Sequence, residues 1–175
     1  MLKKIFIALV VIVVAILGYA ATRPDSFRVE RMALIKAPPE TIHPFIADFR
    51  QWPQWSPWEK LDPNMQRTFT GPQRGVGAGY AWKGNGKAGE GRMEIVESRP
   101  SERVVLKLEF IKPFPATNTT TFTLAPKDGG TEVVWTMEGE NTFMGKVFSV
   151  FTDMDRLIGK DFEEGLENLD RATKS

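Results

Sequence analysis

The chain has 175 residues, of which 42% are hydrophobic and 11% aromatic, so it can bury the core of one ordinary domain. Its formal net charge is only +1, and no basic face is apparent, so nucleic-acid binding is not expected. Cysteine is absent and histidine occurs once, which excludes disulfides, thiol nucleophiles, thiolate zinc sites and histidine-based metal clusters. We therefore expect neither a metal nor a cofactor.

An uncharged apolar run, residues 5–21, lies near the N-terminus and follows Lys3 and Lys4. The run is at the short limit for a membrane-spanning helix and slightly longer than a usual signal-peptide core, so both interpretations remain open. Its length and continuity favour an uncleaved single-pass anchor over a signal peptide whose cleavage would release a secreted protein. In both cases the lysines favour a cytoplasmic N-terminus, with the rest of the chain on the periplasmic or extracellular side.

Residues 1–22 are therefore expected to form the anchor or signal peptide, and residues 23–175 one domain. The domain begins with a stretch that has strand character. This stretch ends at Pro38 and Pro39. The two prolines suit the first turn of a helix. The apolar residues that follow at helical spacing are Ile42, Phe45, Ile46 and Phe49.

From Met65 to about Asn141 the pattern is that of strands throughout. Six short runs are separated by Gly, Pro, Asn and Asp, as a meander of antiparallel hairpins requires. The sequence KDGG predicts the tightest turn, at Asp128-Gly129. Alternation in the later strands turns one apolar set toward a buried face: Met93, Ile95, Val104, Leu106, Leu108, Phe110, Phe122, Leu124, Val133, Trp135 and Met137.

The chain is expected to close with one long amphipathic helix from about Thr142 to Lys174. A helix of this length needs a surface to lie on, and a curved sheet would provide it. Its apolar stripe, at steps of three and four, comprises Met144, Val147, Phe148, Phe151, Met154, Ile158, Phe162, Leu166 and Leu169.

Two stretches, IKAPPETIHPFIADFRQWPQWSPW and MDRLIGKDFEEGLENLD, carry a resemblance to a known family. With the order of elements, they resemble the START-like superfamily (SRPBCC, helix-grip), which includes polyketide cyclase/dehydrase and lipid-transfer proteins. The resemblance covers residues 26–173. It implies an α+β helix-grip fold, in which a seven-stranded antiparallel curved sheet wraps a long C-terminal helix and two short helices follow the first strand. It also implies an apolar cavity between sheet and helix, but supplies no catalytic residues.

The expected cavity is lined mainly by aromatic side chains whose faces are predicted to meet between sheet and helix, although each could instead fill a solid core. Asn118 is the polar exception, since it shares its face with Thr120 and Phe122 and must either be hydrogen-bonded or line a wet part of the cavity. The candidate pocket-lining residues are Trp55, Trp58, Trp82, Phe110, Asn118, Phe122, Trp135, Phe148, Phe151 and Met154.

The stretch DFRQWPQWSPWEK places three tryptophans at a spacing of three, and its two prolines prevent a regular helix. We expect it to fold over the cavity mouth as short helical or turn segments. Trp55 and Trp58 are expected to be buried as a plug, with Trp52 nearer the rim.

Sequence signals for catalysis are weak. The single histidine, His43, has no evident partner and is expected at the rim. The run GNGKAG formally matches a phosphate-binding loop, but strand character continues after it, so a hairpin is expected.

Our leading hypothesis is a membrane-tethered or exported module that binds, and by extension transports, a hydrophobic small molecule or lipid. One alternative is a cyclase or dehydrase-type enzyme that uses a pocket acid or amide such as Glu138 or Asn118. Another is a protein-binding module of the chaperone-partner kind that uses the exterior of the sheet.

Overall fold

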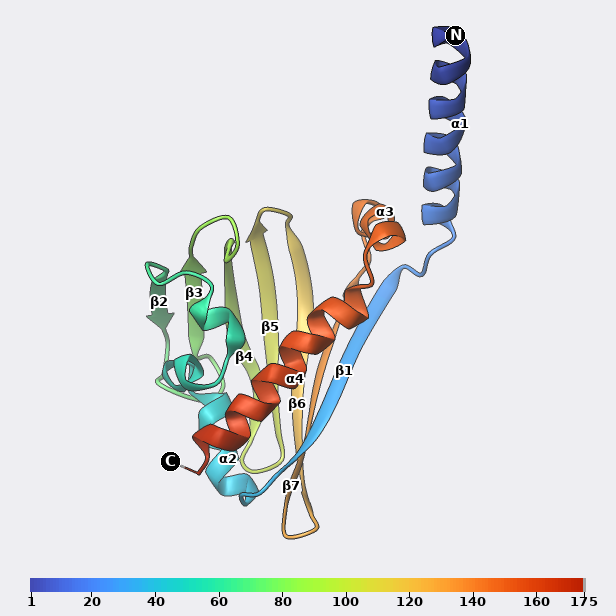
Figure 1. Ribbon diagram of the computed structural model, residues 1–175. Helices are drawn as coiled ribbons and strands as arrows, with labels where there is room; N and C mark the ends of the chain where they lie inside the picture. The colour runs from blue at the N-terminus through green and yellow to red at the C-terminus, as the bar shows by residue number, and fades with distance from the viewer. Residues whose placement is uncertain (175) are drawn as a thin grey trace.

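A seven-stranded antiparallel sheet and a helix that crosses its inner face make up the body of the molecule (Figure 1). The computed structural model describes residues 1–174, apart from the side chain of Met154. The helices are α1 (Leu2–Ala21), α2 (Pro39–Ala47), the 3₁₀ helices η1 (Phe49–Gln54) and η2 (Pro57–Lys60), α3 (Phe143–Phe151) and α4 (Met154–Ala172). The strands are β1 (Ser26–Ile35), β2 (Gln66–Thr70), β3 (Gly79–Lys83), β4 (Glu90–Arg99), β5 (Arg103–Lys112), β6 (Ala116–Lys127) and β7 (Gly130–Glu140).

Six of the strands form a meander, and β1 adds to its far edge by pairing with β7, which gives the order β1-β7-β6-β5-β4-β3-β2. The predicted strands and their inward-facing residues are confirmed. The turn at Asp128-Gly129 is confirmed as well: both residues have positive φ and join the directly paired Lys127 and Gly130, as a tight hairpin requires. One rung of the inner face runs across six strands through Phe27, Gly139, Asn118, Leu108, Met93 and Tyr80.

Helix α4 lies diagonally across the inner face, from β1 toward α2 (Figure 1). Phe162, Leu166 and Leu169, on its sheet-facing side, are at most 1% exposed. The ring of Phe162 stacks on Trp135 of β7, with ring centroids 4.1 Å apart and an interplanar angle of 7°. This contact joins helix and sheet at the centre of the core.

The C-terminal segment is two helices, so the expected single helix from Thr142 is wrong. Thr152 and Asp153 both have extended backbone and separate α3 from α4. The Asp153 side chain accepts a hydrogen bond from the Arg156 backbone N–H at 3.0 Å, and thereby caps the start of α4. Beyond this break α3 has α1 as its main packing partner.

Helix α1 projects away from the domain and is almost entirely exposed (Figure 1). It is the one helix within residues 1–174 that is long and apolar enough to cross a membrane, a property that signal sequences share. Its 20 residues extend about 30 Å, which matches the hydrocarbon thickness of a bilayer. The division into an N-terminal segment of residues 1–22 and a domain of residues 23–175 stays a prediction.

Candidate functional site

The part of the inner face beneath α4 is a packed aromatic cluster. Ring centroids lie 4.7 Å apart for Phe122 and Trp135, 4.8 Å for Trp52 and Trp55, and 5.5 Å for Trp55 and Trp135. All four rings are at most 4% exposed. The filled-core interpretation therefore describes this region, which we call the packed zone: Trp52, Trp55, Phe122, Trp135 and Phe162.

The three tryptophans of residues 48–60 are held by the two 3₁₀ helices. The indole N–H groups of Trp52 and Trp55 donate to the carbonyl oxygens of Ile46 and Phe45, each at 3.0 Å, and so satisfy the last turn of α2. The expectation that Trp52 lies nearer the rim than Trp58 is wrong. Trp52 is 4% exposed because its indole hydrogen bond turns it inward, whereas Trp58 is half-buried.

A second region of the inner face lies toward the end where α1 joins the domain, and α4 does not cross it (Figure 1). Four apolar side chains there, Phe27, Trp82, Met93 and Phe110, are only partly buried. The rings of Trp82 and Phe110 meet edge to face, with centroids 6.0 Å apart. We call this region, together with Asn118, the open zone.

Two buried side-chain oxygens in and beside the open zone have no hydrogen-bond partner among the described residues. Asn118 is 6% exposed and its Oδ1 accepts no hydrogen bond, while its Nδ2 has only the sulfur of Met137, at 3.7 Å. Thr120, two residues along the same face, is 3% exposed and its Oγ1 is also unpaired. A buried polar atom without a partner costs about 1 to 3 kcal/mol. The inner face therefore contains two unpaired polar oxygens within an apolar surface, and their burial lowers the stability of the fold.

Two glycines make room for the side chains of the open zone. A Cβ at Gly139 would overlap the Asn118 amide oxygen and lie 2.9 Å from Phe27 Cε1. A Cβ at Gly91 would lie 2.5 Å from the Trp82 ring. The positions of Asn118, Phe27 and Trp82 thus depend on strand residues that have no side chain.

A buried polar network lies beside the open zone. The Glu59 carboxylate, 8% exposed, accepts hydrogen bonds from Arg67 Nε at 2.7 Å and from the Tyr80 hydroxyl at 2.6 Å. Burial, and then the neighbouring carboxylate, raise the pKa of Tyr80, so the hydroxyl remains a donor. Each group has a partner, and the network anchors η2 to β2 and β3. Its members are distant in the chain, so no local pattern in the sequence indicates it.

The histidine has a partner that the sequence did not reveal. His43 Nε2 lies 3.2 Å from Ser98 Oγ, and burial, followed by the charge of Arg74, lowers the His43 pKa. Within residues 1–174, no hydrogen bond links the other ring nitrogen to a carboxylate, so the pair lacks the orienting acid of a catalytic triad.

Glu138, suggested as a pocket acid, points to the outer face, where it is exposed and pairs with Arg28. It cannot act on the inner face. The described residues also bring together no group of three or more His, Asp or Glu that could hold a metal ion.

The candidate pocket residues fall into separate places. Trp55, Phe122 and Trp135 belong to the packed zone, and Trp58 lies at its edge. Trp82, Phe110 and Asn118 belong to the open zone. Phe148 and Phe151 are 54% and 69% exposed on α3, away from the sheet. The side chain of Met154 lies outside the described residues.

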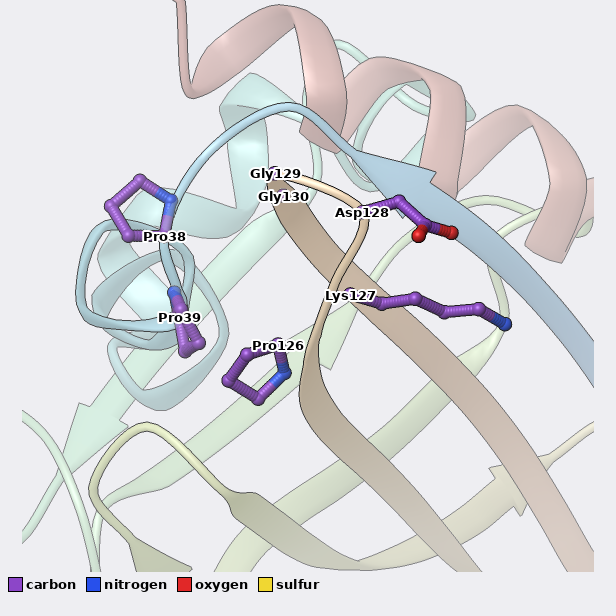
Figure 2. A pocket seen from close by; sticks show the side chains of 7 residues that line it. All are labelled: Pro38, Pro39, Pro126, Lys127, Asp128, Gly129 and Gly130. Carbon is purple, nitrogen blue, oxygen red and sulfur yellow. The ribbon is translucent and has the colours of Figure 1, made fainter.

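A surface hollow of about 480 Å³ lies elsewhere, between the β6–β7 turn and the start of α2 (Figure 2). Pro38, Pro39 and Pro126 form its wall, while the side chains of Lys127 and Asp128 point away from the prolines (Figure 2). It shares no residue with either zone, so we do not assign it to the site.

The architecture, a curved antiparallel sheet that holds a C-terminal helix, with short helices after the first strand, is the helix-grip fold. The model of the family described as "Polyketide cyclase / dehydrase and lipid transport" matches residues 26–174, and the chain belongs to this family. Such a fold is suited to hydrophobic-ligand binding or to cyclase/dehydrase-like chemistry.

Solved structures agree on the fold. CV1439 from Chromobacterium violaceum is 18% identical, with a TM-score of 0.60 over 87% of this chain and 99% of that chain. Mll3558 from Rhizobium loti is 21% identical, with a TM-score of 0.58 over 84% and 95%. DynU16, from the dynemicin biosynthetic locus, is 14% identical, with a TM-score of 0.60 over 87% of this chain but 48% of that chain. No curated protein sequence matches the chain.

Proposed function

We propose that the chain binds a hydrophobic small molecule or lipid at the open zone. The observation that carries the proposal is the pair of unpaired polar atoms, Asn118 Oδ1 and Thr120 Oγ1, within an apolar surface that is only partly covered. A ligand that supplies a hydrogen-bond donor to Asn118 would remove the cost of that buried carbonyl. Its apolar body would cover the partly buried rings beside it.

The surroundings favour a neutral ligand with an apolar body and a hydroxyl or similar polar group. The open zone, Phe27, Trp82, Met93, Phe110 and Asn118, contains no charged side chain. The neighbouring guanidinium of Arg67 is already engaged by Glu59. A charged headgroup would therefore lose its hydration without gaining a counterion.

We further propose that α1 is an uncleaved anchor, with the domain on the periplasmic or extracellular side. Support comes from the length and exposure of α1 and from Lys3 and Lys4 at its N-terminal end. An anchor would keep the open zone close to the bilayer, where hydrophobic ligands dissolve, and would suit a role in lipid transport.

Binding is favoured over catalysis because the buried ionisable groups in the described structure have structural partners. Asp48 and Asp62 each accept backbone hydrogen bonds, Glu59 binds Arg67, and Lys146 binds Asp25. None of these is left free beside the open zone to transfer a proton.

Purified residues 24–175 test the binding proposal, since the main hydrophobic cluster between sheet and α4 contains no residue of α1. Native mass spectrometry, followed by organic extraction, should detect a neutral apolar compound bound to the folded domain. A ligand-free protein that also fails to bind a neutral apolar fluorescent probe would contradict the proposal. A compound that leaves chemically altered after incubation would instead support the enzyme alternative.

A further inference from the structure

Helix α3 exposes an apolar face that has no cover within the domain. Phe143, Met144, Phe148 and Phe151 are 52 to 69% exposed. The single charged residue of the helix, Lys146, is turned inward and forms an ion pair with Asp25. A continuous uncharged surface of this kind is typical of a contact with another apolar phase.

The position of α3 is fixed by α1. The two helices pack against each other, and the guanidinium of Arg23, just after α1, donates to the carbonyl oxygen of Ser149 at 3.1 Å. Figure 1 shows α3 beside the end of α1 that joins the domain. A bilayer crossed by α1 would thus have its surface at the level of α3.

The β5–β6 turn lies at the same end of the sheet. Register places it there, because Ser26 pairs with Glu140, at the α1 end of β1, while Phe110 pairs with Ala116 beside the turn. Figure 1 shows this turn and the β3–β4 turn at that end. Phe114, in the β5–β6 turn, is 73% exposed, and Ile111 is 43% exposed.

The β3–β4 turn adds positive charge at this end. Lys83, the last residue of β3, and Lys87, in the turn, are both exposed. Basic side chains near a membrane surface are attracted to anionic lipid headgroups. Apolar side chains on α3 and the β5–β6 turn, flanked by lysines, match the composition of surfaces that lie in the membrane interface.

We propose that α3, the end of β5 and the β5–β6 turn form a docking face for the lipid bilayer, which comprises Phe143, Met144, Phe148, Phe151, Ile111 and Phe114. The inference rests on the proposed anchoring by α1, and goes beyond it by assigning the orientation of the domain. The open zone lies at the same end of the sheet, since Phe27 and Asn118 are on a rung next to the strand ends there. Docking would therefore direct the open zone toward lipid, and the ligand would enter from the bilayer.

The absence of native cysteine allows a direct test on the full chain. Single cysteines at Val11, Phe114, Phe148 and Asp128 would each carry the fluorophore NBD, in vesicles of phosphatidylcholine with and without phosphatidylglycerol. Val11 reports on the anchor, and Asp128, at the opposite end of the sheet, is the matched water-exposed control. Emission at Phe114 and Phe148 should shift to shorter wavelength relative to Asp128, more so with anionic lipid, and spin-labelled lipid should quench it.

The outcomes separate the two claims. Burial of Val11 in the bilayer together with water-like emission at both Phe114 and Phe148 would overturn the docking face while leaving the anchor intact. A blue shift at Phe148 without quenching by spin-labelled lipid would also overturn it, since the face would then be covered by protein. Water-like emission at Val11 would remove the anchor and with it the docking face. Circular dichroism of each labelled protein would establish that the fold is retained.

Discussion

Gly139 of β7 and Asn118 of β6 are directly paired, and the Asn118 side chain occupies the space that a Cβ at Gly139 would need. An added methyl group would overlap Oδ1 and lie 2.9 Å from Asn118 Cγ. The Asn118 amide can thus occupy this position only because Gly139 has no side chain. The two residues act as one unit of the candidate site.

Replacement of Gly139 by alanine should force Asn118 and the Phe27 ring to move. Overpacking of this kind costs about 1 to 3 kcal/mol, and ligand affinity should fall as well because the amide is displaced. Gly86→Ala is the matched control, since its Cβ would meet nothing within 4 Å, and its effect should stay within about 0.5 kcal/mol. Urea unfolding of residues 24–175 measures the free energy of unfolding of both variants. Equal stability of the two variants would contradict the packing argument.

Asn118→Leu should separate stability from binding. The leucine removes a buried carbonyl that has no partner, so the free energy of unfolding of the ligand-free domain should rise by about 1 kcal/mol. Ligand affinity should fall, because the acceptor is lost. Thr119→Val, on the opposite face of β6, should change neither quantity appreciably. If Asn118→Leu retained full affinity, the amide would have no role in recognition.

The Phe162–Trp135 stack is expected to be the main contact that attaches α4 to the sheet. Phe162→Ala leaves a cavity at a fully buried position and should lower the free energy of unfolding by about 3 to 5 kcal/mol. Phe114→Ala, which removes a ring that is 73% exposed, should cost about 0.5 kcal/mol or less. Chemical denaturation of both variants tests the difference, and similar losses would show that α4 is not held by this stack.

The stability of the domain should depend on the protonation of His43. Burial lowers its pKa, so the folded protein binds the proton more weakly than the unfolded chain does. The stability contributed by the neutral ring is complete above pH 6.5 and is lost as the pH falls from 6.5 through the folded-state pKa.

The pKa of Asp161 is raised, and this acts on stability in the opposite direction. Because Asp161 is present in both proteins, comparison with His43→Gln isolates the effect of His43. Urea titrations across this range should show a steeper decline for the natural protein. Parallel pH profiles would contradict the assignment. His43 is the single histidine in the sequence, so no second imidazole contributes.

Much of the fold could be predicted from sequence because its signals are local. Strand alternation identified the inward set, and KDGG specified its turn from two residues alone. The break between α3 and α4 was missed, although Asp153 is a suitable N-cap and could have indicated a new helix start. The apolar stripe continues through the break, and periodicity cannot distinguish burial against a sheet from contact with another helix such as α1.

The site was less predictable, since it depends on contacts between distant segments. Alternation placed Asn118 on the inner face. Whether its amide oxygen finds a hydrogen-bond partner depends on the residues that β5 and β7 place beside it. The order of burial among Trp52 and Trp58 was wrong because it is decided by an indole hydrogen bond to α2. Whether aromatic residues fill a core or line a cavity is decided by packing, which a periodic pattern does not contain.

The central claim is that a neutral hydrophobic ligand lies on the open zone with its polar group at Asn118. A long-chain alcohol that carries a diazirine, photolysed with the full chain in vesicles and mapped by peptide mass spectrometry, tests it most directly. Adducts should concentrate on Phe27, Trp82 and Phe110, and should decrease in Asn118→Leu but not in Thr119→Val. Adducts confined to α1 and α3, or an unchanged pattern in Asn118→Leu, would contradict the account.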